Sequence, residues 1–331
     1  MPLVSVVILV WKNTEHVAAC LNALQKQTYR DFEVFLVDNG SNQFDALSRI
    51  QKKHSDLPIF MEQVEVNVGY AAGNNIGARL AHGHWLALLN DDAFPQPDWL
   101  ETLIHAAGRH PDFTFFASRQ IQNDRPHLLD GAGDAYHITG LAWRRCYNRS
   151  TKTYGLTQEE VFSACPAAAL YLRADFINAG GFDEDYFSYF EDVDLGFRLR
   201  LHGGRCLYVP EAVVHHVGSA STGKRSEFSV YYGYRNMIWT FFKNMPSPYF
   251  WLFLPLHISA ILFFTAYLTL RGQGRAIWRA VFDALRGLPR QLAKRRQIQK
   301  NRKVQPAEII RTLSSGFLEP YREFVQRNRP S

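Results

Sequence analysis

Two adjacent carboxylates follow a short apolar run in the first third of the chain. Residues 85–89 read WLALL, which is typical of a buried strand, and Asn90, Asp91 and Asp92 come directly after them. Carboxylates at a strand end suit a hard cation, because Mg²⁺ is usually held by one or two carboxylates together with substrate phosphates. A solvated turn ahead of Pro95 explains the same residues equally well, so the rest of the chain must decide.

A second acidic cluster lies about a hundred residues further on. Glu191, Asp192 and Asp194 fall within four positions at the start of a helix that we expect over 193–201. Carboxylates this close repel one another, so a cleft that holds them needs donors or a cation nearby. Capping of the helix N-terminus, where the macrodipole favours anions, accounts for one of these acids but not for all three. We therefore expect at least one of them to have a chemical task.

His215 and His216 follow a predicted strand over 206–209 and a predicted turn at Pro210. A histidine at this place is a metal ligand, a base or a core residue, and the residue type alone does not decide between these roles.

The elements that must position these residues alternate along the first ninety positions. Short β-rich runs separated by amphipathic stretches predict βαβ units and a mostly parallel sheet in a three-layer α/β domain. Ligands of such sheets bind beyond the carboxyl ends of the strands. Polar residues follow three of the predicted strands, at 12–13, 38–41 and 90–92, so we expect them to converge on one site. The predicted strands cover 4–10, 33–37, 59–64 and 85–89, and the predicted helices cover 15–25, 45–54 and 74–81.

The chain lacks the common phosphate-binding loops. No GxGxxG follows the first strand and no GxxxxGK[ST] occurs, which argues against dinucleotide-binding and P-loop proteins. Asp38 can accept hydrogen bonds from a pyrimidine edge, with Asn13 and Asn39 as neutral polar contacts. An ordinary Asx turn explains 38–41 as well. Residues 69–77 (GYAAGNNIG) lead into a predicted helix, and their glycines permit close backbone approach to a ligand.

Taken in order, these segments resemble the inverting family-2 glycosyltransferases of GT-A fold, and within them the rhamnosyltransferase-like branch. The resemblance covers about residues 3–245 and implies a Rossmann-like mixed, mostly parallel sheet that binds a nucleotide-diphospho-sugar. The matching segments are VDNGS at 37–41, NVGYAAGNNIG at 67–77, LALLNDD at 86–92, GGFDEDYFSYFEDVDLGFRLRLHG at 180–203, and HHVGSAS at 215–221.

The resemblance implies a role for each motif. Asp38 would read the base of the nucleotide-sugar donor, and Asp92, in the position of a DXD motif, would contact Mg²⁺ or Mn²⁺. Asp192, next to Glu191, would be the catalytic base. His216 would lie near the metal, although neighbouring His215 can fill the same role. The other implied contacts to the donor are Val10, Asn13, Asn39, Asn67, Gly69, Asn75, Asn90 and Asp91.

The implied reaction divides the work between the two acidic clusters. Inverting transfer is a single displacement, which needs one base for the acceptor hydroxyl and one electrophile for the departing diphosphate. It needs no enzymic nucleophile that forms a covalent sugar intermediate. Asp192 and the cation at Asp92 would supply the two roles.

Charge is distributed unevenly along the chain. Residues 271–331 hold 15 Lys and Arg against 4 Asp and Glu, a net +11, whereas residues 1–270 hold 22 against 27, a net −5. We therefore expect a glycosyltransferase domain over 1–243, with a nucleotide-sugar half (1–92) and an acceptor half (93–243), and a membrane-associating helical region over 244–331. A basic tail of this kind indicates an anionic membrane surface or nucleic acid as partner.

An apolar segment before the tail favours the membrane. Residues 244–270 carry no Asp, Glu, Lys or Arg, and 249–270 are mostly aliphatic or aromatic. Pro255 and His257 interrupt the run, so a spanning helix, a broken hairpin, an in-plane helix and a buried soluble helix all remain open. No nucleic-acid motif accompanies the charge. We expect attachment to the cytoplasmic face of the membrane, a lipid-linked or polysaccharide acceptor, and no secretory signal.

Two other functions remain in view. A processive polysaccharide synthase usually adds several membrane helices and a QxxRW motif, and this sequence has no such motif. A catalytically silent, membrane-bound sugar-binding scaffold is the alternative from a different class, and intact Asp92 and Asp192 argue against it. The four cysteines lie far apart without a CxxC pair, which argues against a zinc site and a disulfide framework.

Overall fold

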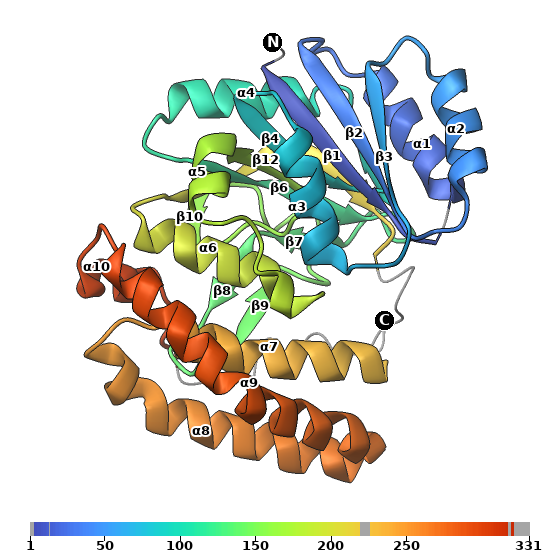
Figure 1. Ribbon diagram of the computed structural model, residues 1–331. Coiled ribbons are helices and arrows are strands. Elements are labelled where there is room, and N and C mark those ends of the chain that lie inside the picture. The colour runs from blue at the N-terminus through green and yellow to red at the C-terminus, as the bar shows by residue number, and fades with distance from the viewer. Residues whose placement is uncertain (1–2, 13, 219–225, 317–318, 321–331) are drawn as a thin grey trace.

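The structure is a computed structural model, and it describes residues 3–12, 14–218, 226–316 and 319–320. Asn13, a predicted donor contact, lies outside the described residues, as do residues 219–221 of the HHVGSAS segment. Figure 1 shows a sheet domain above a layer of C-terminal helices. The elements are β1 (Val4–Val10), α1 (Thr14–Gln25), β2 (Phe32–Asn39), α2 (Phe44–Lys53), β3 (Ile59–Val64), α3 (Tyr70–Leu80), β4 (Trp85–Asn90), β5 (Ala93–Pro95), α4 (Trp99–Arg109), β6 (Phe115–Gln122), β7 (Leu129–Ala132), β8 (Asp134–Tyr136), β9 (Ala142–Arg144), β10 (Glu159–Val161), β11 (Ala168–Leu172), α5 (Arg173–Asn178), α6 (Glu191–Leu201), β12 (Cys206–His216), α7 (Glu227–Asn244), α8 (Tyr249–Leu268), α9 (Gly274–Lys300) and α10 (Pro306–Arg311).

One mixed sheet organises the domain, with the strand order β10-β12-β6-β11-β4-β1-β2-β3. Strands β4, β1, β2 and β3 run parallel to one another, as the alternating pattern predicts. The register pairs Leu9 of β1 with Asn90 of β4, and Val10 of β1 with Asp38 of β2. The polar ends of β2 and β4 therefore flank the end of β1, which confirms that 38–41 and 90–92 meet at one edge of the sheet.

Helices cover both faces of this sheet, because successive strand side chains point to opposite sides. On one face, Ile8 of β1 belongs to a hydrophobic cluster with Leu21 of α1 and Leu103 of α4. On the other face, Val7 of β1 belongs to a cluster with Ala78 of α3 and Leu195 of α6. The predicted three-layer α/β architecture is confirmed (Figure 1).

Two predicted boundaries are wrong. Helix α3 begins at Tyr70 rather than at residue 74, so most of the glycine-rich segment is helix. Strand β12 continues through Pro210 to His216, in place of the predicted turn. Its register against β6 shifts between Val209 and Val213, so a bulge accommodates the proline, which has no N–H to give to the ladder.

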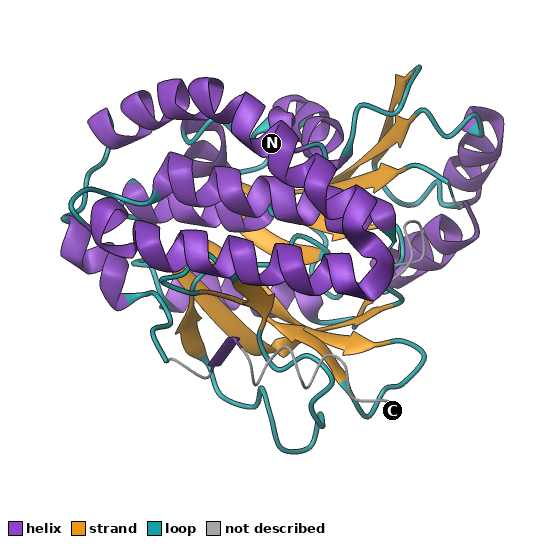
Figure 2. Cartoon of the chain, turned by 90° about the horizontal axis from the view of Figure 1, so that it is seen from below, coloured by secondary structure: helices purple, strands orange, loops and turns teal. Residues whose placement is uncertain are grey.

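The C-terminal helices pack on the domain as a layer of their own, which Figure 2 shows from below. Helix α9 lies against α7, where Trp239 Nε1 donates to the Ala284 carbonyl at 2.9 Å. A Cβ on Gly287 would lie 2.5 Å from the Trp239 ring, so glycine permits the close approach of the two helices. These contacts cross the predicted boundary between residues 243 and 244, and the division into two domains stays a prediction.

Candidate active site

The end of β4 meets the end of β12, where a histidine joins two acids. His216 Nε2 lies 3.2 Å from Asp92 Oδ1, and His216 Nδ1 lies 2.8 Å from Asp130 Oδ2. The three side chains are buried, and the Gly218 N–H donates to Asp92 Oδ2 at 3.2 Å. His215 is the next residue on the strand, so its side chain leaves the opposite face. Of the two histidines, His216 is the one that contacts Asp92.

The pKa values of this cluster follow from its burial and its charges. Burial alone would lower the pKa of His216, but the hydrogen bonds to Asp130 and Asp92 raise it to about 9. Burial alone would raise the pKa of Asp92, but the hydrogen bond from His216 holds it below its ordinary value. Burial and the charge of Asp92 raise the pKa of Asp91 to about 7. The cluster thus places a buried histidine between two carboxylates.

Asn90 connects this cluster to α3. Asn90 Oδ1 accepts a hydrogen bond from the Tyr70 hydroxyl at 2.8 Å, and Asn90 Nδ2 lies 3.4 Å from His216 Nε2. The Tyr70 hydroxyl also reaches the Pro166 carbonyl at 3.3 Å. Asn90 therefore holds Tyr70, the first residue of α3, next to the cluster that His216 forms with the two acids.

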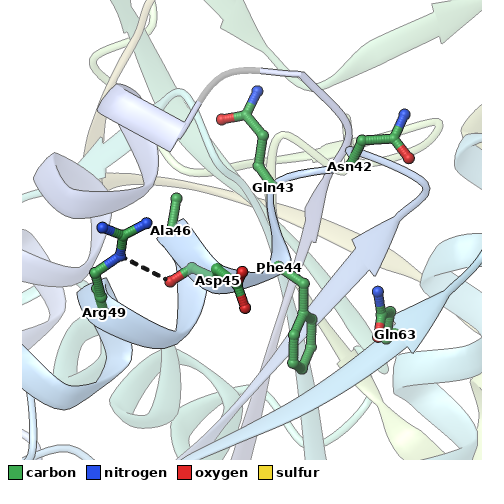
Figure 3. Close-up of a pocket in the computed structure, with 7 residues that line it drawn as sticks. All are labelled: Asn42, Gln43, Phe44, Asp45, Ala46, Arg49 and Gln63. Carbon is green, nitrogen blue, oxygen red and sulfur yellow. Dashed lines mark hydrogen bonds between the residues drawn. The ribbon is translucent and has the colours of Figure 1, made fainter.

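The predicted base-reading residue lies one strand further along the sheet. Asp38 is buried at the end of β2, and its Oδ1 accepts from the N–H of Ser41, three residues further on, at 2.9 Å, which closes the turn after the strand. Gln63 pairs with Asp38 across β2 and β3. A surface pocket begins at this edge (Figure 3), and its lining residues are Asn42, Gln43, Phe44, Asp45, Ala46, Arg49 and Gln63.

Two of the predicted donor contacts shape the loop between β3 and α3. Asn39 Nδ2 donates to Asn67 Oδ1 at 3.0 Å, and Asn39 Oδ1 accepts from the Val68 N–H at 2.9 Å. Asn67 Oδ1 also accepts from the Gly69 N–H at 2.8 Å. The two amides therefore fix this loop against the end of β2, where Val10 and Asp38 lie side by side.

Gly69 and Asn75 make contacts within the protein, and their predicted contacts with the donor stay predictions. Gly69 has φ +91°, and a Cβ there would lie 2.6 Å from the Phe187 ring. Asn75 Nδ2 donates to the Phe182 carbonyl at 2.8 Å, and Asn75 Oδ1 accepts from the Phe182 N–H at 2.8 Å. A Cβ on Gly73 would lie 2.4 Å from Leu9 of β1. The segment 69–77 therefore joins α3 to β1 and to the loop that precedes α6.

The three acids of the second cluster lie in three different environments at the start of α6. Asp194 is fully buried between Arg198 and Lys243, at 2.8 and 2.7 Å. Burial alone would raise the pKa of Asp194, but these two cations hold it below its ordinary value. Glu191 is buried, and its Oε2 has no hydrogen-bond partner within the described ranges. Burial and the charge of Asp192 raise the pKa of Glu191 well above its ordinary value.

Asp192 alone of the three is partly exposed. The Val193 N–H donates to its Oδ1 at 2.7 Å, and burial raises its pKa above the ordinary value against the opposing charge of Arg144. A partly exposed carboxylate whose pKa is raised is a better proton acceptor than an ordinary aspartate.

The backbone that delivers Asp192 is strained. Phe187, Tyr189 and Phe190 all have positive φ, between 63° and 69°, which costs an aromatic residue energy. Asn236 of α7 holds this loop, since its Nδ2 donates to the carbonyls of Tyr186, Ser188 and Tyr189 at 2.7–2.9 Å. Helix α7 therefore holds the loop that positions the acidic cluster.

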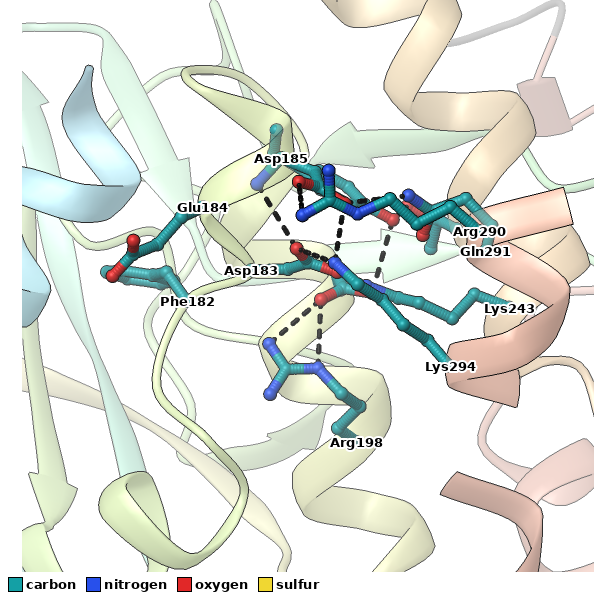
Figure 4. A network of polar contacts seen from close by, with 12 residues as sticks. Phe182, Asp183, Glu184, Asp185, Arg198, Lys243, Arg290, Gln291 and Lys294 are labelled. Carbon is teal, nitrogen blue, oxygen red and sulfur yellow. Dashed lines mark hydrogen bonds and ion pairs between the residues drawn. The ribbon is translucent and has the colours of Figure 1, made fainter. Parts of the chain in front are cut away.

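A network of ion pairs ties the same region to α9 (Figure 4). Lys243 is buried and contacts Asp183 at 2.5 Å, while Lys294 contacts Asp183 at 2.5 Å and Asp185 at 2.6 Å. Arg290 reaches Asp185 at 2.7 Å. Burial alone would raise the pKa of Asp183, but Lys243 and Lys294 hold it well below its ordinary value. The network joins the residues before α6 to two C-terminal helices.

Comparison with known proteins decides the family. Residues 5–179 match the family described as Glycosyl transferase family 2, which is more than half of the chain. The chain belongs to glycosyltransferase family 2. The enzyme is 30% identical over 248 residues to an N-acetylglucosaminyl-diphospho-decaprenol L-rhamnosyltransferase of Mycobacterium tuberculosis, which covers 66% of this chain and 77% of that protein. It is 36% identical over 129 residues to the glycosyltransferase AglE of Haloferax volcanii, which covers 35% of this chain and 41% of that protein.

Solved structures of glycosyltransferases share the fold of the enzyme. GalNAc-T7, solved with UDP, GalNAc and Mn²⁺, aligns with a TM-score of 0.61 at 17% identity over 75% of this chain and 49% of that chain. The mannosyltransferase PcManGT of Pyrobaculum calidifontis, solved with GDP-Man and Mn²⁺, aligns with a TM-score of 0.53 at 17% identity over 94% of this chain and 86% of that chain. These likenesses confirm the predicted GT-A fold.

Sequence analysis missed three residues of the glycosyltransferase that connect its two acidic clusters, namely Tyr70, Asp130 and Arg144. The charges of Glu191, Asp192 and Asp92 all act on Tyr70, whose pKa burial raises well above the ordinary value. Arg144 is paired with Asp130 and is close enough to Asp192 for its charge to lower that residue's pKa. Two of these residues have a local sequence signal that could have identified them: Tyr70 directly follows Gly69 of the glycine-rich segment, and Asp130 precedes a glycine. No local signal marks Arg144.

The residues at Asp92 fit a divalent cation whose remaining ligands come from the substrate. No group of three or more His, Cys, Asp or Glu residues within the described ranges has the arrangement of a full metal site. Asp92 Oδ1 and His216 Nε2 nevertheless face each other, and Asp130 holds the other nitrogen of the ring, as carboxylates behind a histidine ligand do at metal sites. Mg²⁺ and Mn²⁺ are commonly held by one or two protein ligands and the phosphates of a substrate.

Proposed function

We propose that the enzyme transfers a sugar from a nucleotide-diphosphate donor to a lipid-linked or growing polysaccharide acceptor of a bacterial surface, with inversion and with the help of Mg²⁺ or Mn²⁺. L-rhamnose or another deoxyhexose is the proposed sugar, because the relative in Mycobacterium tuberculosis is an L-rhamnosyltransferase. That relative's name also contains a lipid diphosphate, which supports the proposed lipid-linked acceptor.

The observation that carries the proposal is the pairing of Asp92 with His216 on one side and a partly exposed Asp192 on the other. Asp192 takes the proton of the acceptor hydroxyl as that oxygen attacks the anomeric carbon. Glu191 keeps a buried, uncompensated carboxyl beside it, which favours a proton on Glu191 and leaves Asp192 as the charged member of the pair.

On the donor side, Asp92 and His216 would hold the cation, with Asp91 and Asn90 beside it on the same turn. The cation, when bound, supplies positive charge to the departing diphosphate. Asp38, with the backbone of Val10 and the loop fixed by Asn39 and Asn67, would receive the base and ribose. The pocket that Gln63 lines would extend this end of the proposed donor site. Asn13 is part of the proposal on its sequence position alone.

The donor is identified by thermal shift of the full chain with a panel of nucleotide-sugars, with and without Mn²⁺. A ligand at a hundred times its Kd stabilises the native state by about 2.7 kcal/mol, which corresponds to an upward shift of roughly 4 °C for a chain of this size. We expect a deoxyhexose nucleotide to shift the melting temperature only when Mn²⁺ is present. No shift with any nucleotide-sugar, and no metal-dependent release of nucleoside diphosphate, would leave the silent scaffold as the better explanation.

A further inference from the structure

The outermost C-terminal helix exposes an apolar surface. Helix α8 lies at the lower edge of the molecule in Figure 1, with α7 between it and the sheet domain. Its most apolar 18-residue window is only 11% buried, although by length and composition the segment could cross a membrane. Trp251 is 69% exposed, and Leu262 and Phe263 are exposed to a similar degree. A contiguous apolar surface of this kind is uncommon on a soluble protein unless something binds it.

Helix α9 carries two separate apolar faces. Ile277, Ala280 and Ala284 are buried against α7. A second row has the helical spacing i, i+4, i+7 and i+14, yet it is exposed: Trp278 by 58%, Phe282 by 65%, Leu285 by 58% and Leu292 by 37%. The packing of α9 on α7 does not require this second row.

The exposed row of α9 continues the surface of α8. Ile261 of α8 shares a hydrophobic cluster with Val281 and Leu288 of α9. On a helix with about 100° per residue, Val281 and Leu288 lie directly beside the row of Trp278 and Leu285. The two helices therefore present one joined apolar face.

A row of arginines borders this face on the side away from α8. Arg275, Arg279, Arg286 and Arg290 follow the spacing i, i+4, i+11 and i+15, and all four are exposed. Arg290 contacts Asp185 and Arg279 lies 3.8 Å from Asp283, so Arg275 and Arg286 are the members of the row that form no ion pair within the described residues. Aromatic and aliphatic residues flanked by arginines are what an anionic lipid surface binds.

Helix α8 is fastened to the catalytic domain at its middle. His257 is fully buried, its Nδ1 lies 2.7 Å from the Thr139 carbonyl, and its ring stacks on Phe241 with centroids 4.1 Å apart. A Cβ on Gly140 would lie 2.4 Å from the His257 ring. A helix held in this way cannot cross a bilayer without breaking these contacts, whereas its outer face is free to lie on one.

We propose that the joined face of α8 and α9, namely Trp251, Leu262, Phe263, Trp278, Phe282 and Leu285 with the arginine row beside it, docks in the plane of an anionic bilayer and that α8 does not span it. The inference rests on the proposed membrane attachment and specifies the surface that makes it. Helix α7 packs under this face and holds the loop before Asp192, so one helix lies between the proposed docking face and that loop.

The test is binding of the purified full chain to vesicles of phosphatidylcholine alone and with roughly 30% phosphatidylglycerol, which supplies the anionic surface. We expect binding to require the anionic lipid and to weaken about a hundredfold or more in Trp278→Glu/Phe282→Glu, since each of the two lost apolar side chains is worth at least a factor of about ten. Arg275→Gln/Arg286→Gln should weaken binding several-fold per charge. Phe60→Glu, an exposed aromatic on the edge strand β3, is the matched control and should bind as wild type.

Insertion and self-association are separated from docking by two further readouts. Leu270 is 87% exposed at the bend between α8 and α9, so Leu270→Cys in a Cys146→Ser background should react with an impermeant maleimide on vesicles. Protection of that cysteine in sealed vesicles would show that α8 spans, and lipid-free dimers that Trp278→Glu/Phe282→Glu abolishes would show a second copy on this face. Either result, or equal binding of neutral vesicles, overturns the inference. Metal-dependent donor hydrolysis, measured without lipid, reports separately on the proposed sugar transfer.

Discussion

Asp130 provides a sharp test of the proposed cation site, because it contacts His216, one of the two residues proposed to hold the cation. In Asp130→Asn, His216 Nδ1 loses a charged acceptor at 2.8 Å inside the protein, while Asp92 and His216 themselves remain. Hydrogen bonds to charged groups contribute about 1.5–3 kcal/mol. Loss of such an outer partner typically weakens metal binding about 10- to 100-fold. The two ranges agree, because each factor of ten corresponds to about 1.4 kcal/mol.

The assay is titration of Mn²⁺ into the enzyme with a saturating nucleoside diphosphate, followed by calorimetry or by the loss of the free Mn²⁺ resonance signal. We expect Asp130→Asn to raise the Kd for Mn²⁺ about 10- to 100-fold. Asp134→Asn is the matched control, since Asp134 is also a buried acid near Arg144 but hydrogen-bonds to Ser163. Unchanged Mn²⁺ affinity in Asp130→Asn, together with a large loss in Asp92→Asn, would refute the role given to Asp130.

Three further predictions concern the region around α6. Lys243→Met should destabilise the chain by about 3–5 kcal/mol in urea denaturation, because it removes a fully buried cation that Asp183 and Asp194 share and leaves Asp183 with Lys294 and Asp194 with Arg198 alone. Arg145→Gln at the more exposed Arg145–Glu159 pair should cost less than about 1 kcal/mol. The folded-state pKa values of Asp183 and Asp194 are lowered, so this stabilisation is present above the unfolded pKa of about 3.9 and is lost as pH falls below it; a Lys243→Met difference that is constant from neutral to strongly acidic pH would contradict the argument. Asn236→Leu removes three hydrogen bonds from the strained loop and should lower kcat by about tenfold or more with little change in donor binding, so equal losses in both would point to general unfolding. The pKa of Asp192 is raised, so kcat/KM should fall with decreasing pH at values above the ordinary aspartate range near about 3.9, and an acid limb at or below that range would argue against Asp192 as the base.

The sequence predicts the parallel half of the sheet well because its signal is local. Each strand from β1 to β4 is an apolar run bounded by polar residues, and the order of the runs determines that their carboxyl ends meet. The sequence alone therefore suffices to place Asp92 and Asp38 at one edge of the sheet. The predicted end of β12 is too early because Pro210 is typical of a turn, and only the neighbouring strands β6 and β5 reveal a bulge instead.

The remaining parts of the site depend on contacts that no local pattern records. Asp130 and Arg144 come together through the pairing of β7 with β6 and of β9 with β8, in a region without periodicity. The support of the Asp192 loop comes from Asn236, about forty residues further along the chain. The close approach of Gly69 to Phe187 has no local signal either, because a glycine next to a ligand and a glycine next to an aromatic ring look alike in a sequence.

The central claim is that Asp192 is the base of a metal-assisted sugar transfer, and Asp192→Asn tests it most directly. The measurement compares donor affinity, by calorimetry with the nucleotide-sugar and Mn²⁺, with turnover, by release of nucleoside diphosphate. The substitution keeps the size of the side chain and an oxygen that can accept from the Val193 N–H, so we predict donor affinity within about twofold of wild type and turnover lower by about 10²- to 10⁴-fold. Turnover within a few-fold of wild type, with intact donor binding, would contradict the account.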